Sequence, residues 1–286
     1  MWTRRRVQVA LVVVGSVLVA RGLAIAPHAR DDQPAVTAIP DFKVTLLGTG
    51  TPNPRPDRFG PSTLVEAGPE RLVFDCGRSC TTRLWQLKIP LGTVKLFITH
   101  LHSDHTVGIP DLWLTGWLTQ PYGTRKAPFR VWGPEGTVAM MSNLEKSYEA
   151  DIHIRQPQGA AAAIDAKDFT EGVVYQENGV RVTAFKVAHA DINAFGFRID
   201  YKGHSVVLSG DTRTSENLIR HAQNVDLLIH EVASPETFQR AGAPPERTTS
   251  ILAHRTQSRR ERCLRGRSLS WRCIHTSCCQ TPPSRI

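Results

Sequence analysis

The chain has 286 residues, of which 41% are hydrophobic, and its formal net charge is +9. That length and hydrophobic content allow one substantial core or two small ones. The positive charge lies at the two ends, because three arginines stand at positions 4–6 and residues 255–286 hold eight arginines against one glutamate. The residues between are close to neutral, so composition gives no support to a basic nucleic-acid-binding surface there.

Residues 1–26 have the composition of a targeting segment. Three arginines precede residues 7–20, which contain no charged residue, and small residues follow. Such a run is short for a membrane span and fits the apolar region of a signal peptide. Because Arg21 interrupts the run and Pro27 follows the expected cleavage point, an uncleaved membrane anchor and a soluble N-terminal helix are the alternatives. A signal peptide and a membrane anchor both predict an exported domain that is periplasmic, secreted or membrane-anchored. In either case the N-terminal segment engages the membrane or the export machinery, and residues 27–40 form a polar linker.

Hydrophobic periodicity and turn residues predict strands and helices that alternate along residues 41–254. The Gly-Thr-Gly sequence at 48–50 is weak evidence for phosphate binding on its own, and a tight turn is the simpler interpretation. The apolar stripe at 112–118 favours a helix in the core over a substrate wall. The expected strands are 42–47, 62–66, 71–74, 96–98, 129–132, 195–199, 206–208 and 225–229, together with a hairpin that begins at 173 and whose return strand is 180–187. The expected helices are 81–87, 112–118 and 137–148.

Three histidines and an aspartate lie within six positions directly after the apolar strand at 96–98, in the sequence LFITHLHSDHT. Imidazole and carboxylate groups are ligands for Zn²⁺, and alternation along an extended chain places His100 and His102 on one side. Asp104 and His105 then turn back toward a second site. A solvated His-rich loop is the alternative, but a buried strand that leads directly into these residues favours metal binding.

This HxHxDH sequence after a strand resembles the signature of the metallo-β-lactamase-fold hydrolases, and the resemblance covers residues 42–254. The sequence LGTGTPNP at 47–54 is similar to the first loop of the ribonuclease Z and arylsulfatase-like branch. The resemblance implies an α/β fold, an αββα four-layer sandwich, over residues 41–254. It also implies two zinc ions, one held by His100 and His102 and the second by Asp104 and His105.

Two later residues match further ligands of that family. His189, which precedes a Gly-aromatic-x-Ile strand, would complete the first zinc site, although a lone histidine at a strand end is more often structural. Asp211, in the sequence SGDT, resembles the aspartate that bridges both metals, and a helix cap is the simpler alternative. Class B β-lactamases generally lack this bridge, so Asp211 favours phosphodiesterase or arylsulfatase-like chemistry.

The resemblance also suggests residues that support the site. Asp75, in an Asp-x-Gly element, would orient the metal loop, and a turn residue is the equal alternative. His230 and Glu231 resemble the His-Glu pair of ribonuclease Z relatives, with a capping or core role as the alternative. The candidate catalytic residues are Asp104 and, as a proton donor, His254.

The resemblance breaks after His254. The family closes the second site with a histidine at the end of a late strand, whereas residues 255–286 are rich in arginine and contain four of the six cysteines, with no strand or helix period. We therefore expect a sandwich that lacks its last strand and helix, followed by an aberrant, disordered tail. A frameshift explains this, since codons can be chosen for 262–278 that spell VFARSQPKLAVYTHIV in another frame. A cysteine-based zinc site or a disulfide tail is the alternative.

These observations predict a binuclear zinc hydrolase that cleaves a phosphodiester or a sulfate ester. A water molecule between two divalent ions has a pKa near ~7, so a metal-bound hydroxide is the expected nucleophile. We expect a small-molecule ester substrate and regard nucleic acid as an unfavoured partner, because the domain is near neutral and no Gly/Arg-rich arm lies between positions 133 and 189. The oligomeric state stays open, a dimer included. The alternatives are a catalytically impaired relic that binds at most one zinc and a β-lactamase.

Overall fold

The computed structural model describes residues 41–118, 123–157, 159–232 and 272–276. The strands are β1 Phe42–Gly48, β2 Ser62–Ala67, β3 Glu70–Phe74, β4 Val94–Phe97, β5 Phe129–Pro134, β6 Ile164–Phe169, β7 Gly172–Glu177, β8 Val180–Lys186, β9 Phe195–Tyr201, β10 His204–Leu208, β11 Leu227–Glu231 and β12 Arg272–Thr276. The helices are α1 Cys80–Gln86, α2 Ser103–Thr106, α3 Ile109–Leu118, α4 Thr137–Ser147, α5 Glu149–Arg155 and α6 Glu216–His221, with a 3₁₀ turn at Leu91–Thr93. The expected targeting segment, the linker and His254 lie outside the described residues. None of the described helices is both long enough and apolar enough to cross a membrane.

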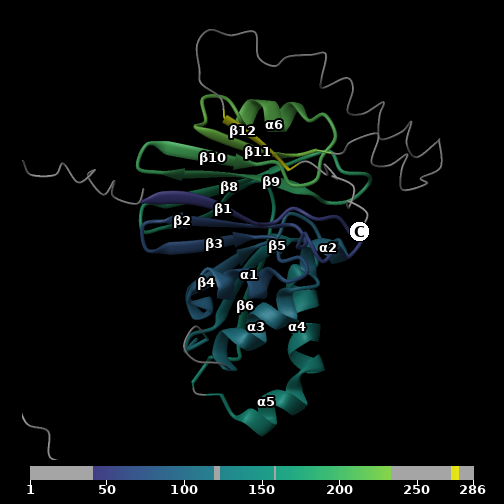
Figure 1. Cartoon of the computed structure of the whole chain (residues 1–286), viewed down its shortest axis with the longest axis vertical. Helices are drawn as coiled ribbons and strands as arrows, with labels where there is room; N and C mark the ends of the chain where they lie inside the picture. The colour runs from purple at the N-terminus through teal and green to yellow at the C-terminus, as the bar shows by residue number, and fades with distance from the viewer. Residues whose placement is uncertain (1–40, 119–122, 158, 233–271, 277–286) are drawn as a thin grey trace, which may run out of the picture. The chain divides into compact units, whose positions relative to one another are not determined.

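The strands form two six-stranded sheets, ordered β1-β2-β3-β4-β5-β6 and β12-β11-β10-β9-β8-β7. In the first sheet β3, β4, β5 and β6 are parallel, and in the second β10, β11 and β12 are parallel. Helices α1, α3 and α4 cover the outer face of the first sheet, and α6 covers the second (Figure 1). The predicted four-layer metallo-β-lactamase-type sandwich is confirmed.

Apolar side chains fill the spaces between these layers. Strand β4 is buried on both faces, so that Leu96 packs toward the helices while Phe97 packs between the sheets. The Phe97 ring stacks on Trp132 of β5 at 4.9 Å and on Phe74 of β3 at 5.1 Å. A strand with both faces covered reads as a continuous apolar run, which is why β4 was predictable. This packing fixes the end of β4, where the histidine loop begins. Trp113, in the predicted apolar stripe, is fully buried in α3, as a core residue.

The structure differs from the sequence-based expectation at the edge of the second sheet. Strand β12, inside the tail expected to be aberrant, pairs in parallel with β11 over the register Leu227↔Arg272 to Glu231↔Thr276. Strand pairing joins backbone groups, and an uncovered β11 would present a row of unpaired N–H and C=O groups. A segment without an apolar period can therefore complete the sheet. The expected loss of the last helix and the frameshift stay predictions.

Candidate metal centre

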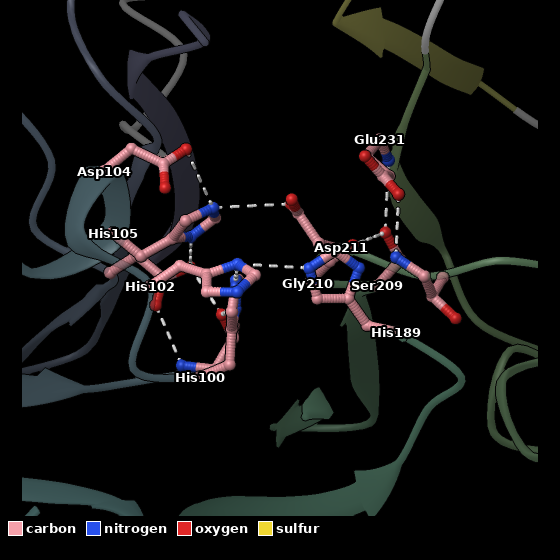
Figure 2. A network of polar contacts seen from close by, with 12 residues as sticks. His100, His102, Asp104, His105, His189, Ser209, Gly210, Asp211 and Glu231 are labelled. Carbon is pink, nitrogen blue, oxygen red and sulfur yellow. Dashed lines mark hydrogen bonds and ion pairs between the residues drawn. The ribbon is translucent and has the colours of Figure 1, made fainter. Parts of the chain in front are cut away.

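The strand ends of both sheets meet at one point. The loop after β4 carries His100 and His102, the short helix α2 that follows carries Asp104 and His105, and the loops after β8 and β10 bring His189 and Asp211 to them (Figure 2). The Phe195 N–H donates to the Thr99 carbonyl at 3.0 Å and so ties the sheets together beside the site. Residues from three separate strand ends therefore form one cluster.

Glycine is required where the Asp211 loop passes between Phe195 of β9 and Thr99, which follows β4. Gly210 has a φ of +59°, and a Cβ at this position would lie 2.7 Å from the Phe195 carbonyl oxygen. Any other residue would be strained in this conformation and would push the loop outward. The Gly-Asp pair thus places the carboxylate of Asp211 close to the histidine loop.

Three imidazole nitrogens form the first ligand group. His102 Nδ1 lies 3.0 Å from His100 Nε2 and 3.3 Å from His189 Nε2. Zinc–nitrogen bonds of 2.0–2.1 Å in a tetrahedral site separate neighbouring nitrogens by about 3.3 Å. Two of the three nitrogen separations therefore match a tetrahedral metal site, and all three nitrogens lie within 4.8 Å of one another.

The second group surrounds a nitrogen without a hydrogen bond. His105 Nε2 is buried and has no hydrogen-bond partner among the described residues. It lies 3.5 Å from Asp211 Oδ1 and 3.7 Å from Asp104 Oδ2, distances too long for a good hydrogen bond. A buried polar atom without a partner costs free energy, and a cation between the imidazole and the carboxylates would remove that cost. His105 and Asp211 thus fit a second metal ion, and their ligand atoms lie within 4.8 Å of one another and of a nitrogen of His100, a group that does not include the predicted ligand Asp104.

Asp75 and Thr99 set the direction of two of the imidazoles. The Asp75 carboxylate accepts hydrogen bonds from the Thr99 N–H and the Thr99 hydroxyl, each at 2.8 Å. It lies 2.8 Å from His105 Nδ1, and the Thr99 oxygen lies 2.9 Å from His100 Nδ1. The Nδ1–H groups of His100 and His105 each have an acceptor, so the Nε2 atoms of both rings are directed at the metal groups. Metal-binding histidines in other proteins are oriented by acceptors in the same way. Thr99, missed in the sequence, is the link between them.

A second set of contacts holds the loops of His189 and Asp211. The Thr212 N–H donates to Glu231 Oε1 at 2.7 Å, and the Glu231 N–H donates to Ser209 Oγ at 3.1 Å. The Ala188 N–H donates to Thr212 Oγ1 at 3.2 Å. Glu231 therefore acts on the site through Thr212, which the sequence analysis did not single out although it follows Asp211 directly. His230 is placed differently, with Nδ1 2.6 Å from the Glu231 carbonyl oxygen.

Burial and neighbouring charges separate the pKa values of the site. Burial, helped by the charge of His105, lowers the pKa of His100 to about 4. Burial alone would lower the pKa of His105 too, but the carboxylates of Asp75 and Asp211 outweigh it and raise that pKa well above its usual value. Burial would raise the pKa of Asp211, but the adjacent imidazole of His105 outweighs it and holds that pKa far below its usual value. His100 is thus neutral and able to bind a metal ion. The ionised carboxylates of Asp75 and Asp211 are stabilised by positive charge beside them.

Solved structures give the class of the protein. The chain is similar to the metallo-β-lactamase-fold protein YhfI from Bacillus subtilis, with 20% identity, a TM-score of 0.56 and coverage of 68% of this chain and 72% of that one. It is also similar to human tRNase Z, short form, with 25% identity, a TM-score of 0.56 and coverage of 73% and 87%. Fold and site together define a metal-dependent hydrolase of the metallo-β-lactamase superfamily.

Sequence comparison narrows the class. A family model described as anti-Pycsar protein Apyc1 matches residues 42–241. Ribonuclease Z from Mycobacterium marinum is 36% identical over 197 residues, which are 67% of this chain and 70% of that protein. The chain belongs to the Apyc1 and ribonuclease Z-like family of metallo-β-lactamase-fold phosphodiesterases.

Proposed function

We propose that the chain hydrolyses phosphodiesters with two divalent metal ions, zinc being the expected metal. His100, His102 and His189 would hold the first ion, and Asp104, His105 and Asp211 the second, with Asp211 shared. The observation that carries the proposal is the arrangement of imidazole nitrogens 3.0 and 3.3 Å apart beside the buried Nε2 of His105, which has no hydrogen bond within the described part of the chain. Nitrogen and oxygen ligands at these positions suit zinc.

The chain's own residues orient the groups around the reaction. Bound divalent ions would lower the pKa of a bound water to about 7 and would offset the negative charge of the phosphoryl oxygens. Asp75 and Thr99 keep the imidazoles in the required tautomers, and Asp104 and Asp211 offer carboxylate oxygens to accept the proton of the attacking water. His254 stays the candidate donor of a proton to the leaving oxygen.

A nucleic-acid phosphodiester is the substrate that we propose. The near-neutral charge of the central part of the chain by itself favours a small ester. The relatives, however, are named ribonuclease Z, and human tRNase Z is similar over 73% of this chain. A domain that is near neutral as a whole can still make strong local contacts to phosphate. Arg213 lies near the site: burial is the main cause of the lowered pKa of His189, and the charge of Arg213 contributes to it.

Metal content together with a substrate panel tests this function. About two zinc ions per chain, with turnover of bis-p-nitrophenyl phosphate and a single-stranded oligoribonucleotide, are expected. Aryl sulfate hydrolysis would indicate the sulfatase alternative, and nitrocefin hydrolysis would indicate a β-lactamase. At most one zinc ion and no turnover of any of these esters would identify a relic and contradict the proposal.

We also propose that the protein is exported. The proposal is supported by the arginine-rich start and the uncharged residues 7–20. Fusing residues 1–40 to alkaline phosphatase, which is active only outside the cytoplasm, tests it. A matched fusion in which Val12, Val13 and Val14 are replaced by aspartate should lose reporter activity, and equal activity of the two fusions would contradict export by this segment.

A further inference from the structure

A cavity of about 350 Å³ with three arginines in its wall lies on the loop after β1. This cavity, here called the arginine pocket, is formed by the loop and by the residues just before α1. Its charged members are Arg55, Arg58 and Arg78, and Asp57 is the acidic residue of the loop. The remaining lining residues are Thr51, Asn53, Pro54, Pro56, Phe59, Gly60 and Ser79. The pocket is therefore positively charged, although the central part of the chain is not.

The arginine pocket and the metal loop are joined through their backbones. The Gly60 N–H donates to the Arg78 carbonyl at 3.0 Å, and the Cys76 N–H donates to the His105 carbonyl at 2.8 Å. A Cβ on Gly60 would lie 2.5 Å from Arg78 N, and one on Gly77 would lie 2.5 Å from the Asp104 carbonyl oxygen. One short segment, from Asp75 to Ser79, thus supports an imidazole of the metal centre and forms a wall of the pocket.

The side chains of the pocket are arranged for an anion. Arg55 donates two hydrogen bonds to Asp57, at 2.9 and 2.7 Å, which places its guanidinium within the loop. Arg78 donates to the Pro52 carbonyl at 2.8 Å, which links the segment before α1 to the loop after β1. A guanidinium is a planar donor that matches phosphate oxygens. Arg55 is already paired with the Asp57 carboxylate, so the guanidinium groups that favour phosphate over an uncharged ligand are those of Arg58 and Arg78.

The glycines of this loop have a different role. Cβ atoms added at Gly48 and Gly50 would lie 1.9 Å from the Gly60 carbonyl oxygen and 2.6 Å from the Phe59 carbonyl oxygen. The Gly-Thr-Gly sequence therefore lets two backbone segments pack closely, in agreement with a tight turn.

We propose that the arginine pocket binds a phosphate group of the substrate next to the one that is cleaved. The inference rests on the proposed nucleic-acid phosphodiesterase function. A chain of nucleotides carries a negative charge on each side of the cleaved bond, and the pocket adjoins the metal loop on one side. Phosphate contacts of this kind position a strand without reading its sequence. The pocket would thus hold the strand in register with the metal centre.

Binding of two oligonucleotides to the full, metal-loaded chain tests the proposal. One is a fluorescein-labelled single strand with phosphorothioate linkages, which are charged and slowly hydrolysed, and the other has uncharged methylphosphonate linkages. In Arg58→Ala and Arg78→Ala, the Kd for the charged strand should rise about fivefold to tenfold, and the slope of log Kd against log salt should become shallower by about 0.7. The Kd for the uncharged strand should change little.

Two further variants separate binding from folding. Arg181→Ala removes an exposed arginine of β8, away from the pocket, and should leave both Kd values unchanged. Asp57→Asn removes the negative charge of the pocket loop and should tighten binding of the charged strand roughly twofold, a gain that a damaged loop would not give. Equal Kd values for Arg58→Ala, Arg78→Ala and Arg181→Ala would overturn the phosphate pocket. Absence of bis-p-nitrophenyl phosphate turnover by the unchanged chain would instead overturn the proposed function.

Discussion

In the part of the chain that the structure describes, a buried polar group lacks a hydrogen-bond partner at one end of the sandwich, whereas buried polar groups are paired at the other. At the carboxyl ends of β3, β4, β8 and β10, His105 Nε2 is buried without a hydrogen bond to any residue that the structure describes, and three imidazole nitrogens lie close together. At the amino ends of β3, β4 and β5, Glu70 is 2% exposed, yet it pairs with Lys95 and accepts a hydrogen bond from Asn178 at 2.6 Å. Arg130 donates two hydrogen bonds to Glu177 beside them.

The difference separates binding groups from structural groups. A buried polar network in which every member has a partner stabilises one arrangement of the strands. A buried nitrogen that lacks a partner while carboxylates stand at 3.5 and 3.7 Å is stable only when something else occupies the space. We infer that the first end, here called the metal end, is organised for a ligand, and the other, here called the ion-pair end, for stability.

The largest effect is expected when a ligand of the metal end is removed. His189→Ala should lower kcat/KM by at least about 1000-fold, because several kcal/mol of transition-state stabilisation come from the metal ions. Zinc content, measured on the purified chain, should fall with it, while the melting temperature of the metal-free chain stays unchanged. His204→Ala is the matched control, since this histidine is exposed on a hairpin. Full activity in His189→Ala would contradict the assignment.

The next effect belongs to the ion-pair end and concerns stability. Lys95→Ala leaves the carboxylate of Glu70 buried without its cation, which should lower the free energy of unfolding by about 2–3 kcal/mol. Urea unfolding measures this change, and kcat should stay within about twofold because the residue lies at the opposite ends of the strands. Lys43→Ala removes a lysine of the more exposed pair with Glu66 and should cost less than about 1 kcal/mol. A loss of activity at constant stability in Lys95→Ala would contradict the division between the ends.

A smaller effect is expected from the residues that orient the ligands. Asp75→Asn removes the charge that holds the Nδ1–H of His105 and should weaken zinc binding about 10–100-fold. Zinc competition with a chromogenic chelator measures the affinity. Asp168→Asn is the control, because Asp168 accepts the N–H groups of Gly136 and Val138 at the start of α4, and should leave zinc affinity unchanged. Equal affinities in both variants would show that Asp75 only shapes its turn.

The sequence was informative about the metal end because its residue types are unusual and lie at strand ends. His100 to His105 follow a strand that is apolar on both faces, and no core position needs that combination of imidazoles and carboxylate. Asp75 could not be decided in advance, and the structure shows both roles, a left-handed φ of 59° and hydrogen bonds to the site. A local sequence does not reveal which distant side chain a carboxylate will meet.

Other parts were not predictable for physical reasons. The ion-pair end joins residues such as Glu70 and Lys95 that are far apart in sequence and look like ordinary surface charges. Strand β6 was missed because it is a half-exposed edge strand with charged residues, which lacks a clear alternation. Strand β12 was missed because backbone pairing does not require an apolar period. Sequencing the gene across codons 250–260 still tests the frameshift, and an intact frame in an independently read gene would contradict it.

The smallest expected effect sharpens the comparison through pH. Burial alone would raise the pKa of Glu70, but hydrogen bonds from Lys95 and Asn178 outweigh it and hold that pKa below its usual value. A carboxyl group whose pKa is lower in the folded chain stabilises the fold above its unfolded pKa, and this contribution is lost as the pH falls through the folded pKa. Stability should therefore decline below a pH of about 4.3, the usual pKa of glutamate. In Glu70→Gln the decline should be shallower when urea midpoints are compared between neutral pH and acid.

Metal-free protein is used, because protonation of the histidines of the metal end would otherwise release zinc and add its own loss of stability. Parallel declines in the two proteins would mean that the buried pair contributes no pH-dependent stability, and that the two ends differ less than their hydrogen bonds indicate.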